Sequence, residues 1–148
     1  MQLQAFELLV LHAVVTAFMT GVIAVVQLVH YPLFSWVNRE AYPEFQRDHM
    51  RRITWVVGLP MLLEAVLALL VCVNRPTGVP GWLAFVGLGL LGVIWLSTVL
   101  QQVPQHERLL KGFNLEAHER LVRSNRVRTV AWFGRLAVAL AMLAVVQP

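Results

Sequence analysis

Hydrophobic residues along this chain fall into four long runs, separated by shorter polar or proline-containing segments. The runs cover roughly residues 5–29, 53–73, 82–100 and 129–146. A helix of about 20 apolar residues crosses the hydrocarbon core of a bilayer, which is about 30 Å thick. Each run is therefore predicted to span a membrane as a helix. The expected fold is all-α, a four-transmembrane-helix bundle that forms one integral membrane domain over residues 1–148.

The composition supports the same class. Hydrophobic residues make up 58% of the chain and charged residues 14%, whereas a soluble globular domain carries roughly 45–50% and 25%. We expect the first segment to be a retained helix, because Met1–Leu11 contains no Lys or Arg, unlike the start of a signal peptide. Cys72 is the only cysteine, which excludes an intrachain disulfide.

A stretch of 29 residues occurs twice, at 30–58 and again 76 residues later at 106–134. Aligned without a gap, the copies share eight mostly polar identities: His30 with His106, Leu33 with Leu109, Asn38 with Asn114, Glu40 with Glu116, Ala41 with Ala117, Arg47 with Arg123, Arg52 with Arg128 and Gly58 with Gly134. Shared apolar composition does not explain such matches. We interpret the bundle as a tandem duplication of a helical hairpin, with repeat 1 at about 1–73 and repeat 2 at about 77–148.

The basic residues concentrate in two connections between the predicted helices. Segments 37–52 and 104–128 hold ten of the twelve Lys and Arg residues. By the positive-inside rule, these basic loops face the cytoplasm and both termini lie on the outer or periplasmic side of the inner membrane. The basic residues thus indicate the orientation of the protein in the membrane. We expect no nucleic-acid partner, because these residues lie against the bilayer and are interleaved with acids.

Single residues mark the ends and irregularities of the predicted helices. Asn38 and Asn114 are predicted N-caps of the second and fourth helices, and Pro60 predicts a kink. The glycines of Gly87–Gly92 have GxGxxG spacing, but no strand precedes them and they lie inside a spanning helix. They are interpreted as sites of close helix packing.

Two charged residues fall near the middle of the membrane, Glu64 in the second apolar run and Arg135 in the fourth. A charge at that depth costs about 3 kcal/mol or more on insertion scales, so both are expected to face inward and find partners. We predict an intramembrane ion pair between Glu64 and Arg135, with His12 nearby.

A second polar group is predicted at the cytoplasmic end of the bundle. The duplication makes His30 equivalent to His106 and Arg52 to Arg128, all at one depth. Four-helix bundles commonly build cofactor sites from facing helices. The predicted pocket comprises His30, His106, His49, Arg52, Asn125, Arg128, Gln27 and Gln102.

Two imidazoles beside two guanidinium groups suit three kinds of ligand: a bis-His haem, a metal ion, or an anionic or quinone-like hydrophobic molecule. His30 and His106 are the expected catalytic residues. No HExxH or other common zinc spacing occurs, so the cofactor is left open between haem and a metal ion.

The chain resembles the anthrone-oxygenase-like family of small four-helix membrane proteins. The resemblance rests on the exits from the first and third helices, His30–Tyr31–Pro32 and Val103–Leu109, and on an Arg- and Asn-bearing fourth helix. It implies oxidation of a hydrophobic polycyclic aromatic, with histidine roles at His30 and His106.

Three functions remain open. The first is a membrane oxidoreductase whose His/Arg pocket binds a hydrophobic aromatic or quinone-like substrate or haem. The second is a non-catalytic accessory or structural subunit of a membrane complex. The third is a small transporter with a polar track through Glu64, Arg135, His12 and His30.

The lipid bilayer is the expected partner in each case, and both a homo-oligomer and a larger membrane complex are compatible with the sequence.

Overall fold

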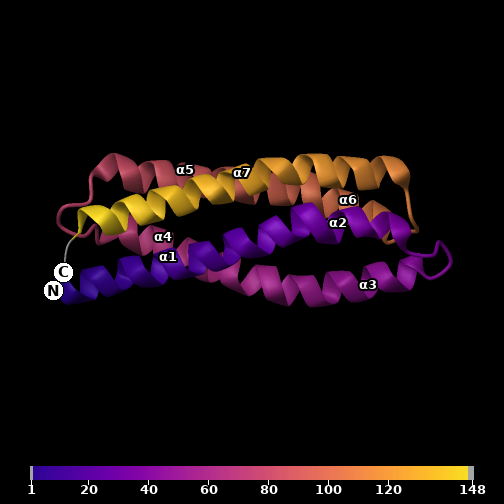
Figure 1. Ribbon diagram of the computed structural model, residues 1–148, viewed down its shortest axis with the longest axis horizontal. Coiled ribbons are helices and arrows are strands. Elements are labelled where there is room, and N and C mark those ends of the chain that lie inside the picture. Colours follow the sequence, from indigo (N-terminus) through magenta and orange to yellow (C-terminus); the bar gives the residue numbers. More distant parts are fainter. Residues whose placement is uncertain (1, 147–148) are drawn as a thin grey trace.

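The computed structural model describes residues 2–146, and their regular secondary structure is helical throughout (Figure 1). Four long helices follow one another along the chain. Helix 1 comprises α1 (Gln2–Val25), η1 (Val26–His30), α2 (Tyr31–Leu33) and η2 (Phe34–Trp36); helix 2 comprises α3 (Tyr42–Ile53), η3 (Thr54–Gly58) and α4 (Leu59–Val73); helix 3 comprises α5 (Gly81–Ser97), η4 (Thr98–Gln102) and α6 (Val103–Leu109); and helix 4 is α7 (Leu115–Val145).

All four helices in the described part of the chain are long and apolar enough to cross a membrane. The all-α fold and the four candidate spans are therefore confirmed. The spans contain 29 to 32 residues, so at 1.5 Å per residue each is roughly 44–48 Å long. This length exceeds the hydrocarbon core of about 30 Å, so each helix is longer than a membrane span requires.

Successive helices run in opposite directions, so the two termini lie at the same end of the bundle (Figure 1). We call this end, which also carries the α4–α5 connection, the terminal end. The opposite end carries the basic segments 37–52 and 104–128 and is called the basic end. Helix 4 packs along both α1 and α5, α4 packs on α1, and α3 packs on α6.

Three of the helices contain a five-residue π-helical segment, and each segment ends two residues before a proline, at Pro32, Pro60 or Pro104. Proline has no N–H and its ring clashes with the carbonyl four residues earlier. That carbonyl falls inside the π segment in every case, where the wider turn accommodates the ring. Helix 4 contains no proline and is α-helical over all its 31 residues.

The two predicted N-caps differ. The Asn114 side chain accepts a hydrogen bond of 2.8 Å from Ala117 N and caps α7, as predicted. Asn38 was wrongly predicted as a cap: it accepts from Glu40 N in a turn, and α3 begins later, at Tyr42. Pro43 occupies the first turn of α3, where its fixed φ favours a helix start, so the chain turns once more before the helix begins.

The π segments of helices 1 and 3 bear on the predicted repeat. They lie at Val26–His30 and Thr98–Gln102, which is an offset of 72 residues and not the 76 of the gapless alignment. The difference is about one helical turn. By local backbone geometry His30 corresponds to Gln102, not to His106. The tandem duplication therefore stays a hypothesis.

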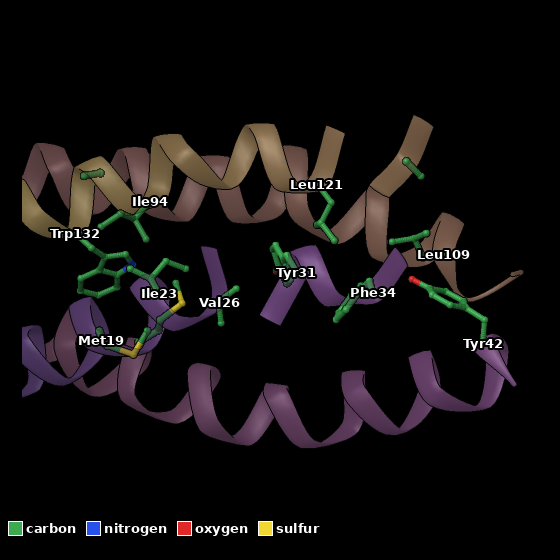
Figure 2. Close-up of a cluster of buried hydrophobic side chains, with 13 residues drawn as sticks. Met19, Ile23, Val26, Tyr31, Phe34, Tyr42, Ile94, Leu109, Leu121 and Trp132 are labelled. Carbon is green, nitrogen blue, oxygen red and sulfur yellow. The ribbon is translucent and has the colours of Figure 1, made fainter. Parts of the chain in front are cut away.

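Two apolar clusters fill the bundle. One, at the terminal end, comprises buried residues such as Leu9, Val71 and Met142. The other extends from the middle of the bundle to the basic end, where Tyr31 and Phe34 on helix 1 follow Val26 in the direction of Leu109 and Tyr42 (Figure 2).

The cap of α7 gives a stability prediction. Replacing Asn114 with Ala should lower the free energy of unfolding by about 1 kcal/mol, because an N-terminal N–H of α7 loses its acceptor. Asn38→Ala is the control and should stay within about 0.5 kcal/mol of wild type. Titration with SDS in detergent micelles, followed by circular dichroism, measures both. Equal losses would show that Asn114 does not act as a helix cap.

Candidate functional site

Near the middle of the bundle, one carboxylate, one guanidinium and one imidazole from three helices are in contact. Arg135 Nη2 donates to Glu64 Oε1. His12 Nε2 lies 2.9 Å from Arg135 Nη2 and 3.4 Å from Glu64 Oε1. The structure thus brings together the three residues for which an intramembrane ion pair was predicted, and all three are buried.

The same group is completed by two neighbours that supply further hydrogen bonds. Thr16 Oγ1 lies 3.2 Å from Glu64 Oε1, and Arg135 Nη1 donates to the Gly87 carbonyl. Gly87 faces helix 4 closely, since a Cβ built on it would be in van der Waals contact with Val138 at 3.5 Å and with Arg135 Nη1 at 3.8 Å. Of the predicted packing glycines, Gly87 alone meets a facing helix. A Cβ built on Gly89 or Gly92 has no neighbour within 4 Å among the described residues.

An apolar layer separates this group from the polar residues of the basic end. Met19, Ile23, Met61, Ile94 and Trp132 belong to one cluster and are at most 3% exposed. They lie roughly one to two turns along their helices from the mid-membrane ion pair. The polar residues of the bundle therefore form two separate layers.

At the basic end four histidine rings surround Phe34, which is fully buried. The ring centroids of His30, His49, His106 and His118 lie 4.9 to 6.5 Å from that of Phe34. They come from helix 1, helix 2, helix 3 and helix 4 respectively. We call this group the histidine cluster. Three of its members are more than 90% buried, and His30 is only partly buried.

Hydrogen bonds fix the orientation of each imidazole. His30 Nε2 and His49 Nδ1 are 3.0 Å apart. His106 is held at both nitrogens, by Tyr31 OH at Nε2 and by Gln46 Nε2 at Nδ1, each at 2.9 Å. Nε2 of His118 donates to the Tyr31 carbonyl at 2.8 Å. The rings of His30 and His106 are linked through His49 and do not contact each other directly.

Three members of this network were not among the residues predicted for the pocket: Tyr31, Gln46 and His118. From the sequence, Tyr31 was considered only as part of the His30–Tyr31–Pro32 exit from the first helix. Gln46 lies three residues before His49, on the same face of α3, and this spacing could have indicated it. His118 has no counterpart in the gapless repeat, where position 42 is a tyrosine, so the repeat gave no signal for it.

Three of the predicted residues form a second hydrogen-bonded set beside the histidine cluster, and a fourth, Gln102, is bonded to helix 4 separately. Asn125 Nδ2 donates to Gln27 Oε1 at 3.1 Å, and Arg128 Nη1 donates to Asn125 Oδ1 at 3.2 Å. Gln102 Nε2 donates to Ser124 Oγ at 2.8 Å. These contacts join helices 1, 3 and 4 at one level of the bundle.

Between helices 2 and 3 lies a cavity of about 200 Å³, which we call the interior cavity. Its lining is mostly apolar and includes Met50, Ile53 and Trp95. Its polar lining comprises Tyr31, Thr54, Thr98, Gln102, His106 and Arg128. All three π-helical segments contribute residues to its wall.

Arg128 is the charged residue of this cavity. It is 4% exposed, and no carboxylate lies within salt-bridge distance among the described residues. Its Nε and the Oε1 of Gln102 have no hydrogen-bond partner in the described part of the chain. A buried cation without a counter-charge costs several kcal/mol, in contrast to Arg135, which has Glu64.

Arg52, the predicted equivalent of Arg128, is not part of the pocket, and this prediction is corrected. Its side chain is 73% exposed and pairs with Asp48 at 2.6 Å. The two positions differ because α3 bears an acid one turn before Arg52, which holds the guanidinium on the helix surface, whereas α7 has Ser124 at the matching position.

His30 and His106 also line different cavities. His106 lines the interior cavity, whereas His30 lies in an apolar groove between helices 1 and 2. A haem ligated by both would need a free nitrogen on each ring, and His106 already uses both nitrogens within the protein. No group of three or more His, Cys, Asp or Glu residues within residues 2–146 is arranged to hold a metal ion. The donors therefore fit neither predicted cofactor.

Comparison with known proteins does not place the chain in a family. No protein-family model, no curated protein and no solved structure matches it.

The contact between Glu64 and Arg135 gives a prediction about stability. Arg135→Met should lower the free energy of unfolding by about 3–5 kcal/mol, because Glu64 then stays buried without its counter-charge. The double variant Glu64→Leu/Arg135→Met should be more stable than Arg135→Met alone, since no buried charge is left unpaired. SDS titration of the variants measures this coupling. Strictly additive losses would contradict the pairing.

Proposed function

We propose that this membrane protein binds a hydrophobic aromatic or quinone-like molecule in the interior cavity, as part of an oxidoreductase-type reaction. The ring lies among the apolar side chains, and an electron-rich or anionic oxygen on the ring faces Arg128.

The uncompensated charge of Arg128 is the observation that carries the proposal. A guanidinium buried beside an unpartnered Gln102 oxygen is stable only if something supplies hydrogen bonds or negative charge. A quinone carbonyl, a phenolate or an enolate oxygen accepts charge-assisted hydrogen bonds from such a group. The ligand oxygen would thus be to Arg128 what the Glu64 carboxylate is to Arg135.

The size and lining of the cavity support a ring-shaped ligand. Its volume of about 200 Å³ is below the roughly 300–1,000 Å³ of pockets for drug-sized ligands, so it suits a small ring system and not a haem. Met50 and Trp95 offer a thioether and an aromatic face, both of which make favourable contacts with aromatic rings.

The hydrogen-bonded chain next to the cavity supports proton exchange with the ligand. Tyr31 OH lines the cavity and is joined to His106 Nε2, and His106 Nδ1 is joined to Gln46. Reduction of a quinone takes up electrons from an external redox partner together with protons at the ring oxygens, and oxidation of a hydroxylated aromatic gives both up. Tyr31 and His106 are the residues that we assign to this proton exchange. The resemblance to the anthrone-oxygenase-like family implies the same class of aromatic ligand.

The alternative of a transporter gains no support from the geometry. A polar track from the mid-membrane ion pair to His30 would cross the apolar layer that contains Ile23, Ile94 and Trp132. Thr20 is the polar side chain buried at this level, and its Oγ1 is engaged with the Thr16 and Trp132 carbonyls, so the path offers a proton or an ion few polar partners.

The orientation proposed for the protein places the basic end in the cytoplasm. It predicts that Thr77→Cys, in a Cys72→Ser background, reacts with a membrane-impermeant maleimide added to intact cells. Lys111→Cys in the same background should react only after the cells are permeabilised. Both positions are exposed in the described structure, so access depends on the side of the membrane. The reverse labelling pattern would contradict the orientation.

Ligand binding can be measured through Trp95, which lines the cavity. We expect 2-hydroxy-1,4-naphthoquinone, an anionic aromatic quinone, to quench tryptophan fluorescence of the detergent-purified protein with a saturable Kd. Arg128→Met should raise this Kd about tenfold or more, because a charged hydrogen bond of about 1.5–3 kcal/mol is lost. Trp95→Phe should remove most of the quenching.

Arg52→Met is the matched control for Arg128→Met. It removes the same charge from the position that the repeat equates with Arg128, but from an exposed side chain. It should leave the Kd unchanged. Equal effects of the two substitutions would show that binding depends on the general positive charge of the basic end, and would contradict a site at Arg128.

A further inference from the structure

A second hollow lies next to the interior cavity, on the other side of helix 2. This side groove has a volume of about 570 Å³ and runs between helices 1 and 2. Its walls are apolar except for His30 and include Phe18, Gly21 and Val25 from helix 1 and Val56 from helix 2. Phe18, Val25 and Val56 are exposed on the surface of the bundle. In a membrane this groove is therefore open to the lipid.

The side groove and the interior cavity share part of their walls. Val26 and Ile53 line both of them. These two residues belong to η1 and to the end of α3, where helix 2 changes from α to π geometry. Val26 and Ile53 are thus part of the wall between the lipid-exposed groove and the interior cavity. A flexible chain that passed between helices 1 and 2 at this level would extend from one space into the other.

We infer that the ligand is an amphiphile, whose ring occupies the interior cavity and whose hydrocarbon tail lies in the side groove. The inference rests on the proposed function and adds the class of substrate, a lipid-soluble quinone or aromatic with an aliphatic side chain. It also assigns the route of access, which runs laterally from the bilayer past Val26 and Ile53.

The shape and chemistry of the groove favour a tail over other occupants. From Ala17 to Val26 it extends roughly 14 Å along helix 1, at 1.5 Å per residue. Its apolar lining offers no partner for a second polar group, except for His30 near the basic end. Lipid tails are as apolar as these walls, so a free acyl chain gains little by binding there. A tail attached to a ring that Arg128 holds is retained in the groove by that attachment.

Gly21 provides a way to fill the groove without disturbing the fold. It lines the groove, and a Cβ built on it has no described atom within 4 Å. Gly21→Leu therefore occupies the space of the tail, and leucine is also the better helix former. Gly89→Leu is the matched control, because Gly89 is likewise exposed in a helix with nothing within 4 Å of its Cβ and lines neither hollow.

The experiment compares two probes on the intact protein in detergent: 2-hydroxy-1,4-naphthoquinone, and the same ring with a decyl chain at position 3. Trp95 quenching gives the Kd of each. Gly21→Leu should raise the Kd of the decyl probe about tenfold or more, and should leave that of the chain-free probe unchanged. Gly89→Leu should change neither. Each variant is compared with wild type using the same probe, so the partitioning of that probe into the micelle affects both Kd values equally.

The possible results separate this inference from the function on which it rests. If the chain-free probe binds and depends on Arg128, but Gly21→Leu does not weaken the decyl probe, the tail site is wrong and the ring site stands. If neither probe quenches wild-type fluorescence saturably, both the ring site and the tail site are wrong. If Gly21→Leu weakens both probes equally, the groove is not a separate tail site and the inference fails.

Discussion

Polar groups inside a membrane bundle need partners within the bundle, because lipid offers none. This constraint organises the interior into two polar layers with an apolar layer between them. In the middle layer, Arg135 has the Glu64 carboxylate, His12 and the Gly87 carbonyl. In the layer at the basic end, Arg128 has the neutral side chain of Asn125 and no carboxylate among the described residues. The first layer pairs its cation with a carboxylate inside the bundle and joins helices 1 to 4, whereas in the second we propose that a ligand supplies the partner of Arg128.

The interior cavity lies where the prolines change the helix geometry. Pro32, Pro60 and Pro104 each follow a π-helical segment, and residues of all three segments line the interior cavity. A π turn is wider than an α turn and shifts the side chains that follow it. Helix 4 lacks such a segment and packs closely along two neighbours, while α3 packs mainly at its end, on α6 (Figure 1). The hollows therefore lie on both sides of helix 2, which makes the bundle less symmetric than a simple duplication would be.

The sequence was sufficient to predict the features that depend on composition and on the free-energy cost of placing a charge in lipid. The apolar runs predicted four spanning helices, and the expense of isolated charges in lipid indicated that Glu64 and Arg135 would face inward and meet. Asn114 was also predicted correctly as a cap, although Asn38, which has the same Asn-x-Glu-Ala sequence, is not one because Pro43 starts its helix later. In each case a single physical rule, acting on nearby residues or on depth alone, determines the result.

The gapless repeat was less informative about side chains. It equated Arg52 with Arg128, but Asp48 holds Arg52 on the surface while Arg128 is buried. It also paired His30 with His106, which line separate hollows and are linked through His49. Such differences depend on which neighbour lies one turn away and on the register of the π segments. Neither follows from the repeat. Tyr31 and Gln46 were not predicted as pocket residues either, because both bond to the imidazole of His106, which lies on another helix.

The central claim is that an aromatic ligand binds in the interior cavity against Arg128. The most direct test is photochemical crosslinking with an azido derivative of 2-hydroxy-1,4-naphthoquinone, followed by peptide mass spectrometry. The account predicts adducts on residues that line the cavity, such as Met50, Trp95 and Val103, which disappear when the unmodified quinone is added in excess. Adducts confined to lipid-facing side chains toward the terminal end, such as Leu69 and Phe85, and insensitive to that competitor, would contradict it.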